Sequence, residues 1–141
     1  MGIQKRADRE KFSRLRQALL HLSNETKGLI EPFFSDRPVI KGTVYELKRR
    51  CGKAGCKCTR GELHASMVVS ASEGGKTRLQ VIPRGFLVEV QQKVRRYQEV
   101  RRARGRLVEI HREMLKVMDA MEAMRREELP CSDKKPSSKG E

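Results

Sequence analysis

Apolar side chains recur at alternating spacings of three and four along the N-terminal part of the chain, the pattern of one helix face. The stripe comprises Phe12, Leu15, Leu19, Leu22, Thr26 and Leu29. Pro32 and the Ser-Asp-Arg-Pro sequence that ends at Pro38 close the segment. The pattern therefore predicts a helix over residues 4–33, within an N-terminal segment 1–38.

A second helical pattern covers residues 84–129. Pro83 stands where a helix can begin, and the range itself contains no proline. Its C-terminal part is an unbroken heptad seam, formed by Val100, Ala103, Leu107, Ile110, Met114, Val117, Met121 and Met124. Upstream, the same heptad spacing is followed by Leu87, Val90, Val94 and Tyr97. A step of three residues, from Tyr97 to Val100, joins this first register to the second. Because a helix of this length spans roughly 70 Å, we expect it to pack on the first helix, on a second copy of the chain, or on both.

Between the two helical patterns, β-branched and polar residues alternate as in half-buried strands. We expect strands over 39–50, 65–72 and 77–82, with a tight Gly74-Gly75 turn between the last two. The predicted fold is therefore α+β: an N-terminal helix, a small three-stranded antiparallel sheet in a domain over 39–83, and a long coiled-coil-like C-terminal helix.

The composition limits the core that this fold can bury. The chain has 141 residues, 37% of them hydrophobic and only 4% aromatic, so a metal, helix seams or oligomerisation must support the sheet. No apolar run reaches the roughly 18 residues of a membrane span. Since the N-terminus also lacks a signal-peptide pattern, we expect a cytoplasmic protein without membrane contact. The tail, 130–141, has the composition of a disordered segment.

The chain has a formal net charge of +14, and residues 39–83 and 84–106 each carry +6 of it. This concentration indicates a polyanionic partner, although a solvated surface is the simpler alternative. Aromatic residues for base stacking are scarce, so we expect phosphate contacts. The candidate nucleic-acid-binding residues are Lys48, Arg49, Arg50, Lys53, Lys57, Arg60, Lys93, Arg95, Arg96, Arg101, Arg102 and Arg104.

Three of the four cysteines and one histidine fall within fourteen residues, as Cys51, Cys56, Cys58 and His64. Thiolates and imidazole are the ligands of structural zinc sites, which are tetrahedral and closed. The sequence therefore predicts that these four residues bind one Zn²⁺. Two alternatives stay open: metal-free reduced cysteines in a turn, and a redox or nucleophilic role for Cys56 or Cys58.

The stretch around this cluster resembles a family of short prokaryotic proteins of unknown function. The family pattern is Arg-Arg-Cys-Gly-Lys-x-x-Cys-x-Cys-x-x-Gly-x-x-His-Gly-Pro, preceded by a glycine. It is matched here by Gly42, Arg49, Arg50, Cys51, Gly52, Lys53, Cys56, Cys58, Gly61 and His64, and Ala65-Ser66 stand in place of its Gly-Pro. The resemblance extends over about residues 39–100. It supports the Cys-Cys-Cys-His unit and implies no activity.

These features predict a non-enzymatic, zinc-stapled, basic protein that binds nucleic acid, DNA rather than RNA, and serves as an accessory factor of a larger assembly. We find no catalytic residue: a catalytic zinc needs an open coordination position and a nearby base. The alternative is an interaction adaptor in which the zinc knuckle is purely structural. In either case we expect a homodimer or a helical protein partner through residues 100–124.

Overall fold

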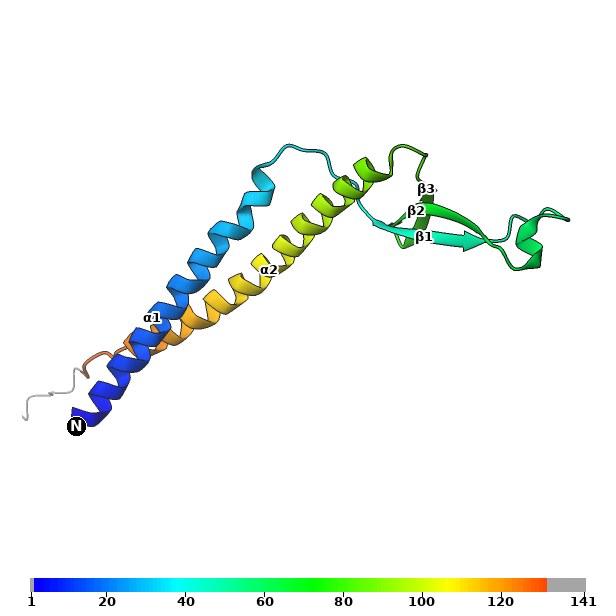
Figure 1. Cartoon of the computed structure of the whole chain (residues 1–141). Helices are drawn as coiled ribbons and strands as arrows, with labels where there is room; N and C mark the ends of the chain where they lie inside the picture. The colour runs from blue at the N-terminus through cyan, green and yellow to red at the C-terminus, as the bar shows by residue number, and fades with distance from the viewer. Residues whose placement is uncertain (1, 132–141) are drawn as a thin grey trace, which may run out of the picture. The chain divides into compact units, whose positions relative to one another are not determined.

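The computed structural model describes residues 2–131, and the chain forms two compact units. One unit combines residues 1–23 with 111–141, and the other comprises residues 24–110. The expected α+β fold is confirmed: an N-terminal helix, a three-stranded antiparallel sheet and a long C-terminal helix follow one another (Figure 1). The predicted disordered tail falls mostly on residues 132–141, which lie outside the described residues.

The two helices have somewhat different limits from those expected. The first helix, α1, is Gly2–Ile30, and a short 3-10 turn, Glu31–Phe34, follows it. The last helix, α2, is Leu87–Arg125. Pro83 does not begin α2, because a turn comes first, in which the backbone N–H of Phe86 donates to the carbonyl of Pro83 at 3.2 Å. No helix among residues 2–131 is long and apolar enough to cross a membrane.

The sheet has the order β1-β2-β3 and is antiparallel throughout, with β1 at Thr43–Arg49, β2 at His64–Glu73 and β3 at Lys76–Val81. The glycine turn between β2 and β3 is present as predicted. Residues 39–42, expected in the first strand, are not part of the sheet. Instead, the backbone N–H of Ile40 donates to the carbonyl of Lys93 in α2 at 3.2 Å.

The core of the unit formed by residues 24–110 lies between one face of the sheet and the start of α2. Val69, Ile82 and Val94 are buried there, and half-buried residues from both elements surround them. On the opposite face, Val68 of β2 is buried at 1% exposed, whereas Leu79 and Val81 of β3 are 51% and 56% exposed. The face of the sheet away from α2 is therefore only partly covered.

The seam of α2 changes its partner along the helix. Its first register supplies Val94 to the sheet core, whereas Ala103 and Ile110 of the second register are buried further along. Between those two, Arg106 pairs with Glu25 of α1. The three-residue step in the heptad pattern therefore falls between a segment that covers the sheet and a segment that meets α1.

Candidate metal centre

The cysteine and histidine cluster lies at one end of the β1–β2 hairpin. The last residue of β1, Arg49, pairs with His64, which begins β2. Cys51 follows β1 after one further residue. Because the two strands are antiparallel, the end of β1 and the start of β2 meet at the same edge, and the loop between them carries the two remaining cysteines.

The loop folds back on itself through two tight turns. Gly52 and Gly55 have φ angles of 75° and 86°, a region that favours glycine. The backbone N–H of Cys56 donates to the carbonyl of Lys53 at 3.4 Å. A short 3-10 turn, Lys57–Arg60, then places Cys58 in the interior of the knuckle. The glycines noted in the sequence thus return the chain toward Cys51.

The four side chains converge on one point. Their ligand atoms all lie within 4.8 Å of one another. The Sγ atoms of Cys51 and Cys58 are 3.5 Å apart, and Cys56 Sγ is 3.1 Å from His64 Nε2. A tetrahedral zinc ion with Zn–S bonds of about 2.3 Å separates its ligand atoms by about 3.8 Å. The cluster therefore could hold a metal ion with small side-chain adjustments.

The local environment shifts the pKa values of the three thiols in different directions. The backbone N–H of Lys53 and the thiol of Cys58 lower the pKa of Cys51, and the backbone N–H of Cys58 and the imidazole of His64 lower the pKa of Cys56. Cys58 is fully buried. The backbone N–H of Cys51 acts to lower its pKa, but burial and the two neighbouring thiols outweigh it, so the pKa of Cys58 is raised. Two of the thiols therefore ionise more readily than a free cysteine, as metal ligands require.

Polar contacts around the cluster hold it in shape. The backbone N–H of Cys51 donates to the Sγ of Cys58 at 3.4 Å. The hydroxyl of Thr59 donates to the carbonyl of Cys56 at 2.6 Å. Such outer contacts orient the ligands of a metal site. The role of Thr59 was not predicted, because a hydroxyl three residues from a cysteine is too common a feature to stand out.

The predicted cations beside the cluster form an exposed set, here called the knuckle cations: Lys48, Arg49, Arg50, Lys53, Lys57 and Arg60. Within the described part of the chain, none of them is paired with a carboxylate. Their charge is therefore directed to solvent or to a partner.

The predicted cations of α2 fall into four situations. Lys93 is paired with Glu89 at 2.6 Å, and the Nε of Arg96 is buried without a partner among the described residues. Arg95 and Arg104 are exposed. Arg101 and Arg102 line a cleft against the sheet, together with residues that include Lys41, Thr43 and Ser70. Sequence reasoning missed Lys41, which stands alone in its segment and gains cationic neighbours only through the fold.

The two groups of cations do not lie side by side, contrary to what their nearness in the sequence suggests. The cluster adjoins Arg49, at the end of β1, whereas the cleft begins at Thr43, at its start. Seven extended residues separate them, a span of roughly 20 Å at 3.3 Å per residue. A partner that contacts both groups must therefore extend along β1.

Comparison with known proteins gives one match. A family model described as "Domain of unknown function (DUF6788)" matches residues 10–92, which include the whole cysteine and histidine cluster. No curated protein and no solved structure matches the chain at a significant level. The matched range ends inside α2 and leaves out the seam from Val100 to Met124.

Proposed function

The chain belongs to the DUF6788 family, which carries no assigned activity, and we propose that it is a non-enzymatic, zinc-stapled protein that binds nucleic acid. We infer DNA as the partner rather than RNA, bound mainly through its phosphate backbone. We infer also that the protein serves as an accessory factor in a larger nucleic-acid-handling assembly.

The observation that carries this proposal is the set of six exposed knuckle cations around a Cys-Cys-Cys-His cluster, none of them paired with a carboxylate of residues 2–131. Of the residues between β1 and β2, only Glu62 is acidic. A cation that faces solvent without a carboxylate partner can neutralise a phosphate and release its counterion. Arg50, Lys53, Lys57 and Arg60 follow β1 within eleven residues, so several of them would engage a phosphate backbone together.

The nature of the cluster favours a structural metal. Four protein ligands fill the tetrahedral positions of Zn²⁺ and leave none for a substrate. A metal bound there would join the end of β1 to the start of β2. Since the face of the sheet away from α2 is only partly covered, the sheet has limited other support, and zinc would contribute folding energy.

A salt-titrated binding assay tests the proposal. Full-length protein, purified without chelator, is titrated into labelled duplex DNA, single-stranded DNA and structured RNA. Neutralisation of about six phosphates predicts a log–log salt slope near −5 for the duplex. Binding that is absent at low salt, or that barely depends on salt, would overturn the proposal.

A matched pair of variants assigns the binding to the knuckle. The first changes Arg49, Arg50, Lys53 and Lys57 to Gln, and we expect a weaker affinity for all sequences, a slope shallower by about 3 and an unchanged zinc content. The control makes the same change of charge at exposed positions of the two helices, Lys5, Lys11, Arg14 and Arg112. Equal effects of the two variants would mean that only the overall charge matters.

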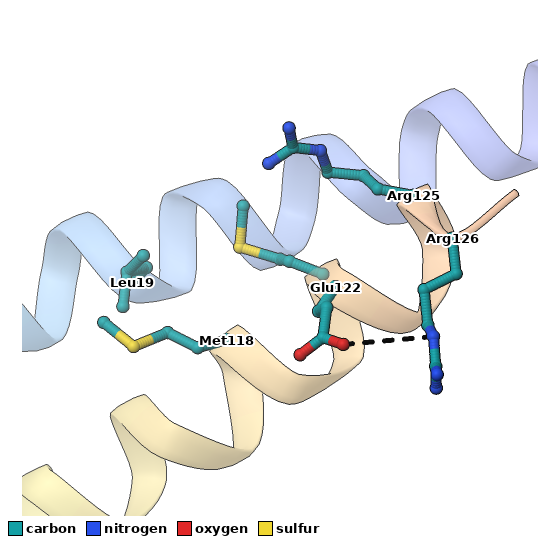
Figure 2. A pocket seen from close by; sticks show the side chains of 6 residues that line it. Leu19, Met118, Glu122, Arg125 and Arg126 are labelled. Atoms are coloured by element: carbon teal, nitrogen blue, oxygen red, sulfur yellow. Dashed lines mark ion pairs between the residues drawn. The ribbon is translucent and has the colours of Figure 1, made fainter.

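The alternative function, an interaction adaptor, is favoured by a groove in the unit that combines residues 1–23 with 111–141. A pocket of about 510 Å³ lies between α1 and the end of α2, where Leu19 faces Met118 (Figure 2), and Met121 also lines it. Met118 and the neighbouring Leu115 are 44% and 47% exposed. A second copy of the chain or a helical partner would cover these side chains.

The two functions differ in their response to salt and in mass. An apolar helix contact depends little on ionic strength, whereas phosphate binding weakens steeply. Light scattering over a range of concentrations would report a homodimer, and a monomer mass at all of them would leave only a different protein partner. Changing Met118 to Glu should dissociate a complex formed through the groove without affecting DNA binding.

A further inference from the structure

A cleft of about 440 Å³ lies between α2 and the start of the β1–β2 ladder, within the unit formed by residues 24–110. One wall is the α2 turn that carries Tyr97, Gln98, Arg101 and Arg102, and the other is the segment 41–43 with the facing residues of β2. Lys41 was not among the nucleic-acid-binding cations predicted from the sequence.

The close approach of Gly42 to β2 builds the sheet side of the cleft. A Cβ atom at Gly42 would lie 2.6 Å from the carbonyl oxygen of Ser70 and 2.7 Å from Cγ1 of Val69, and its φ angle is 142°. Only glycine fits there. The hydrogen bond from Ile40 to the carbonyl of Lys93 joins the same segment to α2. Lys41 is therefore held between Ile40, which is bonded to α2, and Gly42, which is packed against β2. It lines the cleft together with Arg101 and Arg102.

The chemistry of the lining is that of an anion site. Lys41, Arg101 and Arg102 supply three positive charges, and Thr43, Ser70 and Ser72 also belong to the lining. Of the described residues that line the cleft, none is acidic. The three cations are not paired with carboxylates in the described part of the chain. Two guanidinium groups and an ammonium group together match the oxygens of a phosphate.

The position of the cleft relates it to the knuckle cations. The two lie at opposite ends of β1, roughly 20 Å apart for seven extended residues. A DNA duplex rises about 3.4 Å per base pair, so that distance corresponds to about six base pairs. A single duplex that follows β1 can therefore reach both sets of charges.

We propose that this cleft is a phosphate-binding site and that, resting on the proposed function, it holds a backbone phosphate of the same duplex that the knuckle cations contact. Gly42 and the α2 turn shape the site, and Lys41, Arg101 and Arg102 bind the phosphate oxygens. The knuckle and the cleft then fix the direction of the duplex relative to β1, which one cluster alone would not do.

The first experiment compares two triple variants of the zinc-loaded full chain in the duplex-binding assay. The cleft variant changes Lys41, Arg101 and Arg102 to Gln, and the matched control changes Lys5, Arg14 and Arg112, which are exposed and outside the cleft. We expect the cleft variant to lose about tenfold or more in affinity and to have a salt slope shallower by about 1 to 2, and the control to change little. Equal losses in the two variants would overturn the cleft as a contact site.

A second variant keeps the charge and tests the geometry. Changing Arg101 and Arg102 to Lys leaves three cations in the cleft but removes the paired donors of the guanidinium groups. An intermediate affinity with an unchanged salt slope is expected. Circular dichroism and zinc content, measured for every variant, identify any loss that comes from misfolding, and the Lys variant then decides the question because it perturbs the fold least.

The source of the phosphate is settled by a separate arm with inorganic pyrophosphate, followed by backbone amide chemical shifts. We expect the amides of Gly42, Ser70 and Arg102 to shift at millimolar pyrophosphate and to stop responding in the cleft variant. Absence of these shifts together with equal losses of duplex affinity overturns the site. If the wild-type protein binds pyrophosphate in the cleft but binds no nucleic acid, the phosphate site stands, its ligand is a free phosphate compound, and the proposed function is overturned.

Discussion

Cys56 Sγ lies 3.1 Å from His64 Nε2, although eight residues separate the two in the chain. His64 begins β2 and Cys56 precedes the short 3-10 turn of the knuckle. Their contact closes the loop that extends the β1–β2 hairpin, and Cys51 and Cys58 complete the set of four ligand atoms within 4.8 Å. A metal at this point would fix the end of a sheet whose face away from α2 is only partly covered.

We expect one zinc ion per chain, bound by these four residues. Changing Cys58 to Ser should abolish stoichiometric binding, because a buried hydroxyl is a poor substitute for a thiolate in a zinc site. Elemental analysis of protein purified without chelator measures the zinc content per chain. Cys131, exposed and remote in sequence from the cluster, offers the control, and its change to Ser should leave the zinc content unchanged. Well under one equivalent of zinc in the wild type contradicts the prediction.

Removal of the metal should unfold the sheet before the helices. Among the described strand residues only Val68 and Val69 are buried, and metal binding to a small domain contributes to its folding energy. Chelator should therefore broaden or shift the amide resonances of β1, β2 and β3 while most of the helical circular dichroism remains. Unchanged sheet resonances in metal-free protein would show that the core alone stabilises the strands.

Metal affinity should rise with pH through the neutral range. The pKa of Cys58 is raised above its usual 9.0, so its thiol is protonated near neutral pH, and a metal must displace that proton. The lowered pKa values of Cys51 and Cys56 act in the opposite direction and limit the number of further protons released. If binding of each metal ion releases about one proton, the metal affinity should increase about tenfold per pH unit between about pH 6 and about pH 8. Competition titration with a chromogenic chelator at several pH values measures it, and a flat profile would contradict it.

The sequence predicted the fold class because its periodicities are strong. The stripe from Phe12 to Leu29 is buried or half-buried throughout, and so is the seam from Val100 to Met124. Element limits were less accurate. Residues 39–42 alternate like a strand, but they leave the sheet because Ile40 bonds to α2, a tertiary contact that no local pattern encodes. Pro83 suits a helix start, yet a turn takes its place before Leu87.

The cysteine and histidine cluster could be found in the sequence because all four residues fall within fourteen positions of the chain. The cleft could not, since it joins Lys41 to residues sixty positions away in α2, Arg101 and Arg102. Lys93 was also among the predicted nucleic-acid-binding cations. Its ammonium group pairs with Glu89 at 2.6 Å, so its charge is partly neutralised within the protein. Charge counts therefore predicted the basic region but not which of its side chains are available. The proposed limits at 38/39 and 83/84 stay predictions.

The pairing of Arg106 with Glu25 should contribute measurably to stability. The Nε and Nη2 atoms of Arg106 donate to the two carboxylate oxygens of Glu25 at 2.8 Å and 3.1 Å, and both side chains are about one third exposed. Two parallel bonds between half-buried groups are stronger than a surface pair, so Glu25→Ala should cost about 1 kcal/mol. Urea unfolding measures it. The control is Glu10→Ala, which breaks an exposed pair with Arg6 and should cost only a few tenths of a kcal/mol; equal effects would contradict the prediction.

Two glycines of the same unit should respond to alanine in opposite directions. Gly42 has a φ angle of 142°, and a Cβ there would meet the backbone of Ser70 at 2.6 Å, so the neighbour cannot yield. Gly105 lies inside α2, and a Cβ there meets nothing within 4 Å. Gly42→Ala should therefore destabilise the chain by about 2 to 4 kcal/mol, from strain and displacement of β2. Gly105→Ala should stabilise it by about 1 kcal/mol, the difference in helix propensity.

Urea unfolding of the zinc-loaded full chain, followed by circular dichroism, distinguishes these outcomes. Gly42→Ala should also move the segment that carries Lys41 and so weaken duplex binding, whereas Gly105→Ala should leave binding unchanged, because Gly105 does not line the cleft. A loss of binding in Gly105→Ala with normal helicity would instead indicate that the arginines around it need a bend in α2. Wild-type stability of Gly42→Ala would mean that the segment 41–43 does not lie against β2, and the cleft would then lose one of its walls.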